Sequence, residues 1–151
     1  MLDRITAPDE VIGELVRIAH QAYPEEGCAV IVGRAAGDHL ILERVFAADN
    51  VTPDDPRRKF RIDPEILLRS QKAARRSKHG VAVFFHSHPD HPATPSEHDR
   101  KAAWPGAVHL IASAGRDRVF DVAAFELDGS GSFVPVSLEI ETRSAKMGAL
   151  T

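Results

Sequence analysis

A pair of histidines directly follows the most apolar short run of the sequence. Residues 81–85 read Val-Ala-Val-Phe-Phe, which is typical of a buried strand, and His86, Ser87 and His88 come next. Because alternate side chains of an extended segment point to the same side, we expect the rings of His86 and His88 to face one point just past the strand. Neutral imidazole is the commonest protein ligand for metals, so this pair predicts a metal site.

A carboxylate and a hydroxyl follow at a spacing that suits a helix. We expect a helix over residues 95–104, with Thr94 as its N-cap, proline at the first helical position and Glu97 completing a capping box. On such a helix Ser96 and Asp99 are three residues apart and would share one face. The short connection before the helix would then fold this face back over the two histidines.

Two imidazoles and a carboxylate with no thiolate predict a catalytic zinc site rather than a structural one. His86, His88 and Asp99 would be the ligands, and the fourth position would be left for water. Zinc lowers the pKa of that water from about 15.7 to about 7, which provides a hydroxide nucleophile at neutral pH. The reaction also needs a carboxylate that is not a ligand as its general base. Glu25 and Glu26, at the entry to the first buried strand, are both candidates.

The elements around these residues predict one layered α/β (α+β) domain with a mixed sheet over residues 1–141. Apolar residues at helical spacing predict helices over residues 8–23 and 64–78. Residues 50–63 have no periodicity and are expected to form a loop, and residues 142–151 to form a flexible tail. Strands are expected at residues 28–32, 40–47, 81–85, 108–112, 119–127 and 133–140, with a turn at 33–38.

Composition excludes several classes of protein. The 151 residues contain no apolar run of about 18, and the acidic N-terminus lacks the apolar region of a signal peptide. A net charge of −3 makes nucleic acid an unfavourable main partner. The single cysteine, Cys28, excludes an internal disulfide framework and is expected to be a small core residue. We therefore expect a cytoplasmic protein that binds neither membrane nor nucleic acid.

The histidines, the serine and the aspartate together resemble the JAMM signature of the MPN-plus metalloproteases. His-Ser-His-Pro begins at His86, Ser96 follows His88 after seven residues, and Asp99 follows after two more. The resemblance covers residues 5–127 and implies a curved mixed sheet flanked by helices, related to the cytidine deaminase fold. It implies that His86, His88 and Asp99 bind one zinc ion per chain, and that Ser96 hydrogen-bonds the oxyanion of the tetrahedral intermediate.

The same resemblance distinguishes between the two candidate bases. In the segment Pro-Glu-Glu-Gly-Cys that ends at Cys28, the family's catalytic glutamate stands two residues before the cysteine, which selects Glu26. Glu26 would take a proton from the zinc-bound water and pass it to the leaving amine. The compact chain resembles the bacterial branch akin to CysO-cysteine peptidase. That branch implies cleavage of the amide bond after the C-terminal Gly-Gly of a ubiquitin-like β-grasp sulfur-carrier protein.

Alternative functions and residue roles remain open at this level. The chain could remove ubiquitin-like tags from protein lysines, or it could serve as a non-catalytic MPN-type scaffold. A base deaminase is disfavoured, because the H-x-E and P-C-x-x-C motifs of that class are absent from the sequence. The basic run at residues 57–61 could be a solvated loop or could dock an acidic face of a protein substrate. We expect His91 and His98 to be exposed, His109 to be a surface or hydrogen-bonded core residue, and Trp104 to serve packing.

Overall fold

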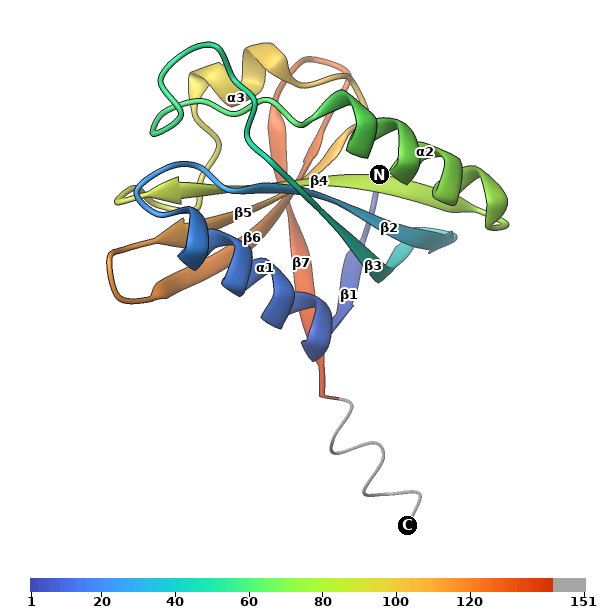
Figure 1. Ribbon diagram of the computed structural model, residues 1–151. Helices are drawn as coiled ribbons and strands as arrows, with labels where there is room; N and C mark the ends of the chain where they lie inside the picture. The colour runs from blue at the N-terminus through green and yellow to red at the C-terminus, as the bar shows by residue number, and fades with distance from the viewer. Residues whose placement is uncertain (143–151) are drawn as a thin grey trace.

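Seven strands and three helices make up residues 1–142, the part of the chain that the computed structural model describes (Figure 1). The strands form one closed barrel in the order β1-β3-β2-β4-β5-β6-β7. β1 runs parallel to β3 and β7, and β4 parallel to β5, whereas the other neighbours are antiparallel. The elements are β1 (Arg4–Pro8), α1 (Asp9–Ala22), β2 (Cys28–Ala36), β3 (His39–Ala48), α2 (Pro64–Arg76), β4 (Gly80–Pro89), α3 (Glu97–Ala102), β5 (Val108–Ala114), β6 (Val119–Leu127) and β7 (Phe133–Glu141). The predicted mixed α+β class is confirmed.

Helices α1 and α2 cover opposite faces of the sheet (Figure 1). Leu15 and Ala19 of α1 are fully buried in the main core, which also contains Ile31 of β2. Val32, the next residue of β2, packs instead with Ala74 of α2. Since successive side chains of a strand point to opposite faces, β2 needs apolar residues on both, and this explains its continuous apolar run.

The side chains of strand β4 also alternate between two faces, and this alternation separates its core residues from its histidines. Val83 and Phe85 are fully buried in the core on the α1 side. Phe84, His86 and His88 therefore lie on the opposite face, where α3 and the long loop between β3 and α2 meet. The crossover that contains α3 joins β4 to its parallel neighbour β5. It begins where the histidines end, and so it brings α3 over them.

Strand β1 was not predicted, and the first helix begins one residue later than expected. Residues 4–8 form β1, with the backbone of Ile5 paired to β3 on one side and β7 on the other. Pro8 ends this strand and occupies the N-cap position of α1. Only alternate positions of β1 are buried, and five residues that run straight into an amphipathic helix give little periodic signal of their own. This short strand closes the barrel.

The ends of the other helices and strands differ from the predicted ends by a few residues, and one of these differences changes the role of a residue, Gly33. β2 extends to Ala36, into the predicted turn at residues 33–38, and the chain reverses at Gly37, whose φ is 64°. Gly33 stands at a register shift between β2 and β3, where a Cβ would collide with the Ile41 carbonyl group. The glycine read as a turn residue is therefore a bulge inside the strand. Residues 50–63 form the predicted loop, crossed by one bridge between Asn50 and Ile62.

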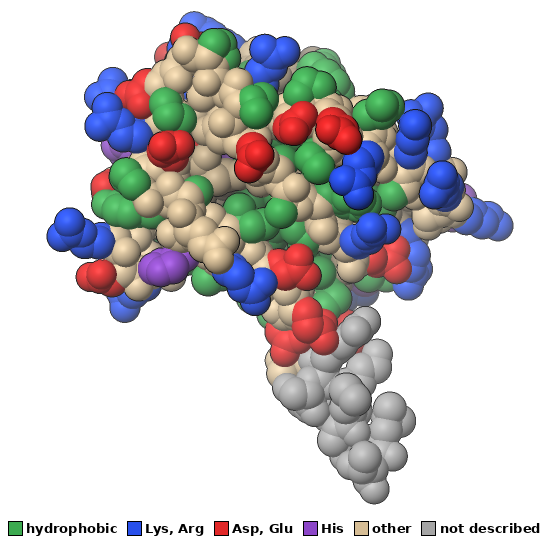
Figure 2. Space-filling view, in the orientation of Figure 1, with side chains coloured by type: hydrophobic (Ala, Val, Ile, Leu, Met, Phe, Trp, Pro, Cys, Tyr) green, Lys and Arg blue, Asp and Glu red, His purple; other side chains and the backbone are tan. Residues whose placement is uncertain are grey.

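No helix in residues 1–142 is long and apolar enough to cross a membrane. Helix α2 presents a strongly basic face at the surface. Lys and Arg side chains gather over α2 (Figure 2), from Arg69, Lys72, Arg75 and Arg76. The tail predicted to be flexible at residues 142–151 lies, from residue 143 on, outside the described residues. The domain boundary at residue 141 stays a prediction.

Candidate metal centre and active site

The structure brings the three predicted ligands together. His86 Nε2 lies 3.1 Å from His88 Nε2, and the two nitrogens lie 3.2 Å and 3.0 Å from the carboxylate oxygens of Asp99. His86 is fully buried, and His88 and Asp99 are 6% and 5% exposed. A tetrahedral ion with bonds of about 2.0 Å separates its ligand atoms by about 3.3 Å, so these spacings fit a single small metal ion.

Hydrogen bonding sets the ring of His88 for coordination. His88 Nδ1 lies 2.9 Å from the carbonyl oxygen of Pro92. In a neutral ring the proton therefore resides on Nδ1, and the lone pair of Nε2 faces His86 and Asp99. Burial lowers the pKa of His86, which favours its neutral form. Burial alone would raise the pKa of Asp99, but its contacts with the two histidines and the hydrogen bond from the Ser96 amide hold it well below its ordinary range. In His88 burial is outweighed by its contacts with Asp99 and the Pro92 carbonyl, so its pKa is raised. In its neutral form this set of two imidazoles and a carboxylate is able to bind a metal ion.

The cap of α3 holds Asp99 in place, and here the prediction from sequence was wrong. Ser96, not Thr94, is the N-cap: its Oγ accepts the Asp99 amide at 3.0 Å, and Asp99 Oδ2 accepts the Ser96 amide at 2.8 Å. The helix begins at Glu97, so Asp99 takes the third helical position that was assigned to Glu97. Capping therefore orients a candidate metal ligand. It also leaves the hydroxyl proton of Ser96 free to donate, because this oxygen is an acceptor in the capping bond.

Glu26 lies beside the metal centre, whereas Glu25 is exposed. Glu26 is 5% exposed, and its Oε1 has no hydrogen-bond partner among the described residues. One carboxylate oxygen of Glu26 lies within 4.8 Å of a ring nitrogen of both His86 and His88. Burial raises the pKa of Glu26 to about 8, with Asp99 adding to the effect and His88 opposing it.

Glu26 could itself be a third ligand, but the contacts favour Asp99. The Asp99 oxygens contact both imidazoles at 3.0–3.2 Å, whereas Oε1 of Glu26 has no hydrogen-bond partner among the described residues. A group that handles a proton of a metal-bound water, rather than the metal itself, requires such a free carboxylate oxygen.

Strand register explains why Glu26 reaches this place. Cys28 pairs with His86 in the antiparallel β2–β4 ladder, so Glu26, two residues earlier, falls opposite His88. The pairing continues at Gly27 and Ser87: the Gly27 amide donates to Ser87 Oγ at 2.8 Å, and the Ser87 amide donates to the Gly27 carbonyl at 3.0 Å. Ser87 therefore holds the start of β2 against β4 beside the site. The sequence analysis missed this role, although Ser87 lies between the two candidate ligands His86 and His88.

Asn50 is a second supporting residue that the sequence did not reveal. Its Nδ2 donates to the Glu26 carbonyl at 3.0 Å and to the Lys59 carbonyl at 2.9 Å, and its Oδ1 accepts the Arg61 amide at 3.0 Å. The Glu26 amide in turn donates to the Pro56 carbonyl at 2.7 Å. The loop is thus tied to the backbone of the candidate base, and only this partly buried hydrogen-bond network distinguishes Asn50 from an ordinary turn asparagine.

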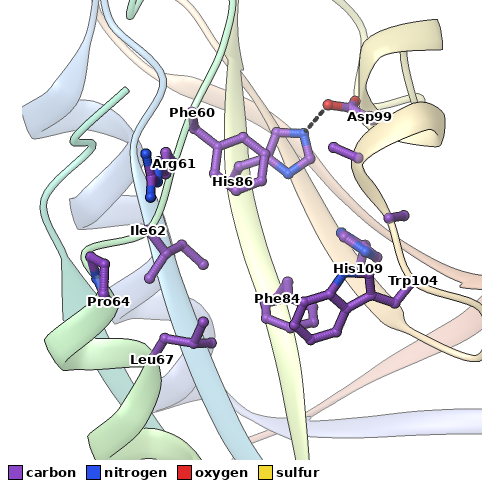
Figure 3. Close-up of a pocket in the computed structure, with 12 residues that line it drawn as sticks. Phe60, Arg61, Ile62, Pro64, Leu67, Phe84, His86, Asp99, Trp104 and His109 are labelled. Carbon is purple, nitrogen blue, oxygen red and sulfur yellow. Dashed lines mark ion pairs between the residues drawn. The ribbon is translucent and has the colours of Figure 1, made fainter. Parts of the chain in front are cut away.

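Two cavities of different chemistry open on either side of the metal centre. On the Glu26 side, a polar groove of about 560 Å³ is lined by Glu26, His88, Ser96, Arg57 and Arg58, among others. On the other side, a mainly apolar cavity of about 300 Å³ contains His86 and Asp99 at one end (Figure 3). Phe60 of the long loop stacks on His86 with ring centroids 4.4 Å apart. The two cavities share no lining residue.

Among the remaining histidines the predictions are partly confirmed. His91 and His98 are exposed, as expected. His109 is 6% exposed, yet neither ring nitrogen has a hydrogen-bond partner among the described residues, so the expectation of a surface or hydrogen-bonded residue was wrong. Burial lowers the pKa of His109 to about 4. Trp104 contacts Phe84 edge-on but remains 61% exposed, so packing alone does not account for it.

The barrel, the crossover helix and the buried cluster of His86, His88 and Asp99 agree with the arrangement expected from the JAMM signature. Residues 8–128 match the family of prokaryotic homologs of the JAB domain, and the chain belongs to this family. It is a hydrolase of the JAMM class, and the recognition made from the signature is confirmed.

Two curated relatives carry names that describe an activity. A desampylase of Haloferax volcanii is 34% identical over 108 residues, which cover 71% of this chain and 76% of that protein. A probable TtuB-protein conjugate cleaving protease of Thermus thermophilus is 38% identical over 97 residues, which cover 64% of this chain and 62% of that one. The second match therefore spans somewhat less than two thirds of that relative.

Solved structures agree on the fold. A protein of Desulfitobacterium hafniense superimposes with a TM-score of 0.77 at 30% identity, covering 91% of this chain and 93% of that one. A JAB1/MPN domain protein of Archaeoglobus fulgidus superimposes with a TM-score of 0.54 at 15% identity, covering 91% and 98%. At that identity the second likeness concerns the fold alone.

Proposed function

We propose that the chain is a zinc-dependent peptidase that hydrolyses the amide bond after the C-terminal Gly-Gly tail of a ubiquitin-like β-grasp sulfur-carrier protein. The observation that carries this proposal is the buried cluster of His86, His88 and Asp99, with the unpaired Glu26 carboxylate beside it. The names of the two relatives, a desampylase and a TtuB-conjugate cleaving protease, support a ubiquitin-like substrate. The sulfur-carrier branch is our own narrower choice.

In this proposal each polar residue has one task. His86, His88 and Asp99 hold one zinc ion, which, when bound, lowers the pKa of a water molecule to about 7 and so supplies the nucleophile. Glu26 takes a proton from the attacking water at its carboxylate and delivers it to the nitrogen of the leaving amine, so that the amide bond is replaced by a carboxyl group and a free amine. Ser96 donates a hydrogen bond from its hydroxyl group to the oxyanion, an interaction worth about 3 kcal/mol in the transition state.

The burial of the centre favours a glycine tail. His86 is fully buried and Asp99 is 5% exposed, so the scissile bond must enter deeply to reach them. A Gly-Gly segment presents bare backbone and meets the least steric resistance. Each strand of the closed barrel has neighbours on both sides, so among the described residues the tail finds no strand that is free along its whole length. We therefore place the tail in the cavities beside the cluster.

The direct test is intact-mass analysis of a β-grasp sulfur carrier with one extra cysteine after Gly-Gly. Zinc-loaded wild type should release the cysteine, and Glu26→Gln should bind zinc but not cleave. Glu25→Gln is the matched control, because Glu25 is the adjacent, exposed carboxylate, and it should cleave like wild type. Cleavage by the Glu26→Gln variant would remove Glu26 from the mechanism.

A second substrate separates the alternatives. The same carrier joined through Gly-Gly to the lysine of a peptide tests removal of tags from protein lysines. Cleavage of this conjugate alone would favour the deubiquitinase-like alternative, and cleavage of neither, with bound zinc shown by metal analysis, would favour a non-catalytic scaffold. A cytoplasmic location remains a prediction from the sequence.

A further inference from the structure

The apolar cavity next to the metal ligands has no role in the chemistry described above. It starts at His86 and Asp99 and runs along β4 to Phe84, between α2 on one side and the end of α3 on the other (Figure 3). Ile62 and Leu67 face Trp104 across it (Figure 3). An apolar trough of about 300 Å³ continuous with a catalytic centre has the volume and lining of a binding subsite.

His109 shows that this trough is built to receive a polar backbone as well as an apolar group. Its ring lies beside Phe84, to which its backbone is paired in the β4–β5 ladder, and between Phe84 and Phe133 with centroids at 5.4 Å and 5.3 Å. The side chain is more than nine-tenths buried, and both ring nitrogens lack a partner within the described part of the chain. An unpaired buried polar group is costly, so a donor or acceptor on a bound ligand would satisfy it.

The position of Glu26 decides which part of the substrate enters the trough. Glu26 must face the leaving amine to deliver its proton, and it lines the polar groove together with His88 and Ser96. The leaving group therefore occupies the polar groove. The acyl part of the substrate, which is the carrier tail, must extend from the metal centre to the opposite side, where the trough begins at His86 and Asp99.

We propose that the trough is the specificity pocket for an apolar side chain on the residue that immediately precedes Gly-Gly in the carrier tail, and that His109 hydrogen-bonds the tail backbone there. This rests on the proposed function. Phe84 and His86 are two residues apart on one face of β4, which corresponds to about 6.6 Å of extended chain. A tail with its last glycine carbonyl at the metal centre spans the same distance with its two glycines. Its third residue then stands over Phe84, Leu67 and Trp104.

The fluorescence of Trp104 can report whether a ligand occupies the trough. Trp104 is the only tryptophan in the sequence, and it is 61% exposed at the rim. An aliphatic side chain seated against Phe84 and Leu67 removes water from the indole, so the Trp104 emission should shift to shorter wavelength. Two acetylated peptides, Ac-Ser-Leu-Gly-Gly and Ac-Ser-Ala-Gly-Gly, are titrated into the full zinc-loaded chain. The leucine peptide should bind at least about tenfold more tightly, since three further carbons are buried.

Variants test the walls of the trough with matched controls. Leu67→Ala should reduce the preference for leucine over alanine, whereas Leu68→Ala should not, because Leu68 is the next residue of α2 but is 48% exposed and does not line the trough. His109→Phe keeps an aromatic ring of similar shape and should weaken both peptides by about fivefold without changing the preference. Equal affinity of the two peptides for wild type, or a leucine-dependent emission shift that survives Leu67→Ala undiminished, would overturn the proposal.

The direction of the substrate is tested with a third peptide, Ac-Gly-Gly-Leu-Ser. Binding of this peptide with the same Trp104 shift as the leucine tail would place the leaving group in the trough and refute the assignment. Cleavage assays on carriers that differ only in leucine or alanine before Gly-Gly separate this proposal from the function itself. Equal kcat/KM on both carriers leaves the peptidase and removes the pocket. Selective peptide binding without cleavage of either carrier keeps the pocket and removes the peptidase.

Discussion

Replacing Ser96 distinguishes its capping role from its catalytic one. Ser96 Oγ accepts the Asp99 amide at 3.0 Å, and its loss in Ser96→Ala should cost about 1 kcal/mol of unfolding free energy, or about 2–4 °C in Tm. Ser96→Gly should cost only a few tenths of a kcal/mol, because glycine is a tolerated N-cap. Neither variant has a hydroxyl for the oxyanion. Both should therefore lose about 10²–10³-fold in kcat, whatever their stability.

The assay measures kcat, KM, zinc content and Tm for both variants with the carrier substrate. Zinc should be retained, because the Asp99 carboxylate accepts the backbone amide of Ser96, which both substitutions keep. A transition-state interaction lowers kcat and kcat/KM equally. Thr94→Ala is the control for stability, since Thr94 is not the cap, and it should leave Tm unchanged. Wild-type kcat in Ser96→Gly would refute the oxyanion role and leave Ser96 as a cap only.

Three further predictions follow from charge, burial and the metal cluster. Arg57 and Arg58 line the polar groove, so replacing both with Glu should lower kcat/KM for an acidic carrier at low salt and much less at high salt. The matched double variant Arg75→Glu with Arg76→Glu on α2 should leave kcat/KM unchanged. An equal loss of kcat/KM in both double variants would contradict docking at the groove. Burial raises the pKa of Cys28 to about 12, so a thiol reagent at pH 8 should label the unfolded chain only. The folded state then holds this proton more tightly than the unfolded state, and the Cys28 contribution to stability should fall as pH rises from about 9 to about 12. Chelation should lower Tm and restored zinc should raise it, because a metal bound only by the folded state stabilises it; an unchanged Tm would argue against the metal centre.

Most features that depend on local periodicity were predictable from the sequence, except the N-cap of α3 and the bulge at Gly33, whereas residues whose role depends on distant contacts were not. The alternation of His86 and His88 and the order of the main elements follow from periodicity that a strand or helix carries in its own residues. β1 was missed because its pairing partners, β3 and β7, lie about 35 and 130 residues away. The same holds for Asn50 and Ser87, which act through hydrogen bonds to residues 24 and 60 positions away in the chain. His109 is distinguished only by what its burial leaves unpaired.

The spacing of the signature itself can be understood from backbone geometry. His-x-His is the two-residue period of β4, which places both rings on one face. Ser-x-x-Asp is the distance from an N-cap to the third helical position, so the reciprocal hydrogen bonds that start α3 also fix the ligand carboxylate. The Glu-x-Cys spacing at the start of β2 equals the His-x-His spacing of β4, because antiparallel register places Glu26 opposite His88 once Cys28 pairs with His86. A single insertion between Glu26 and Cys28 would break this register and move the base without touching a ligand. The spacing of the motif therefore follows from the places where a strand, a β-ladder and a helix cap meet around the proposed metal site.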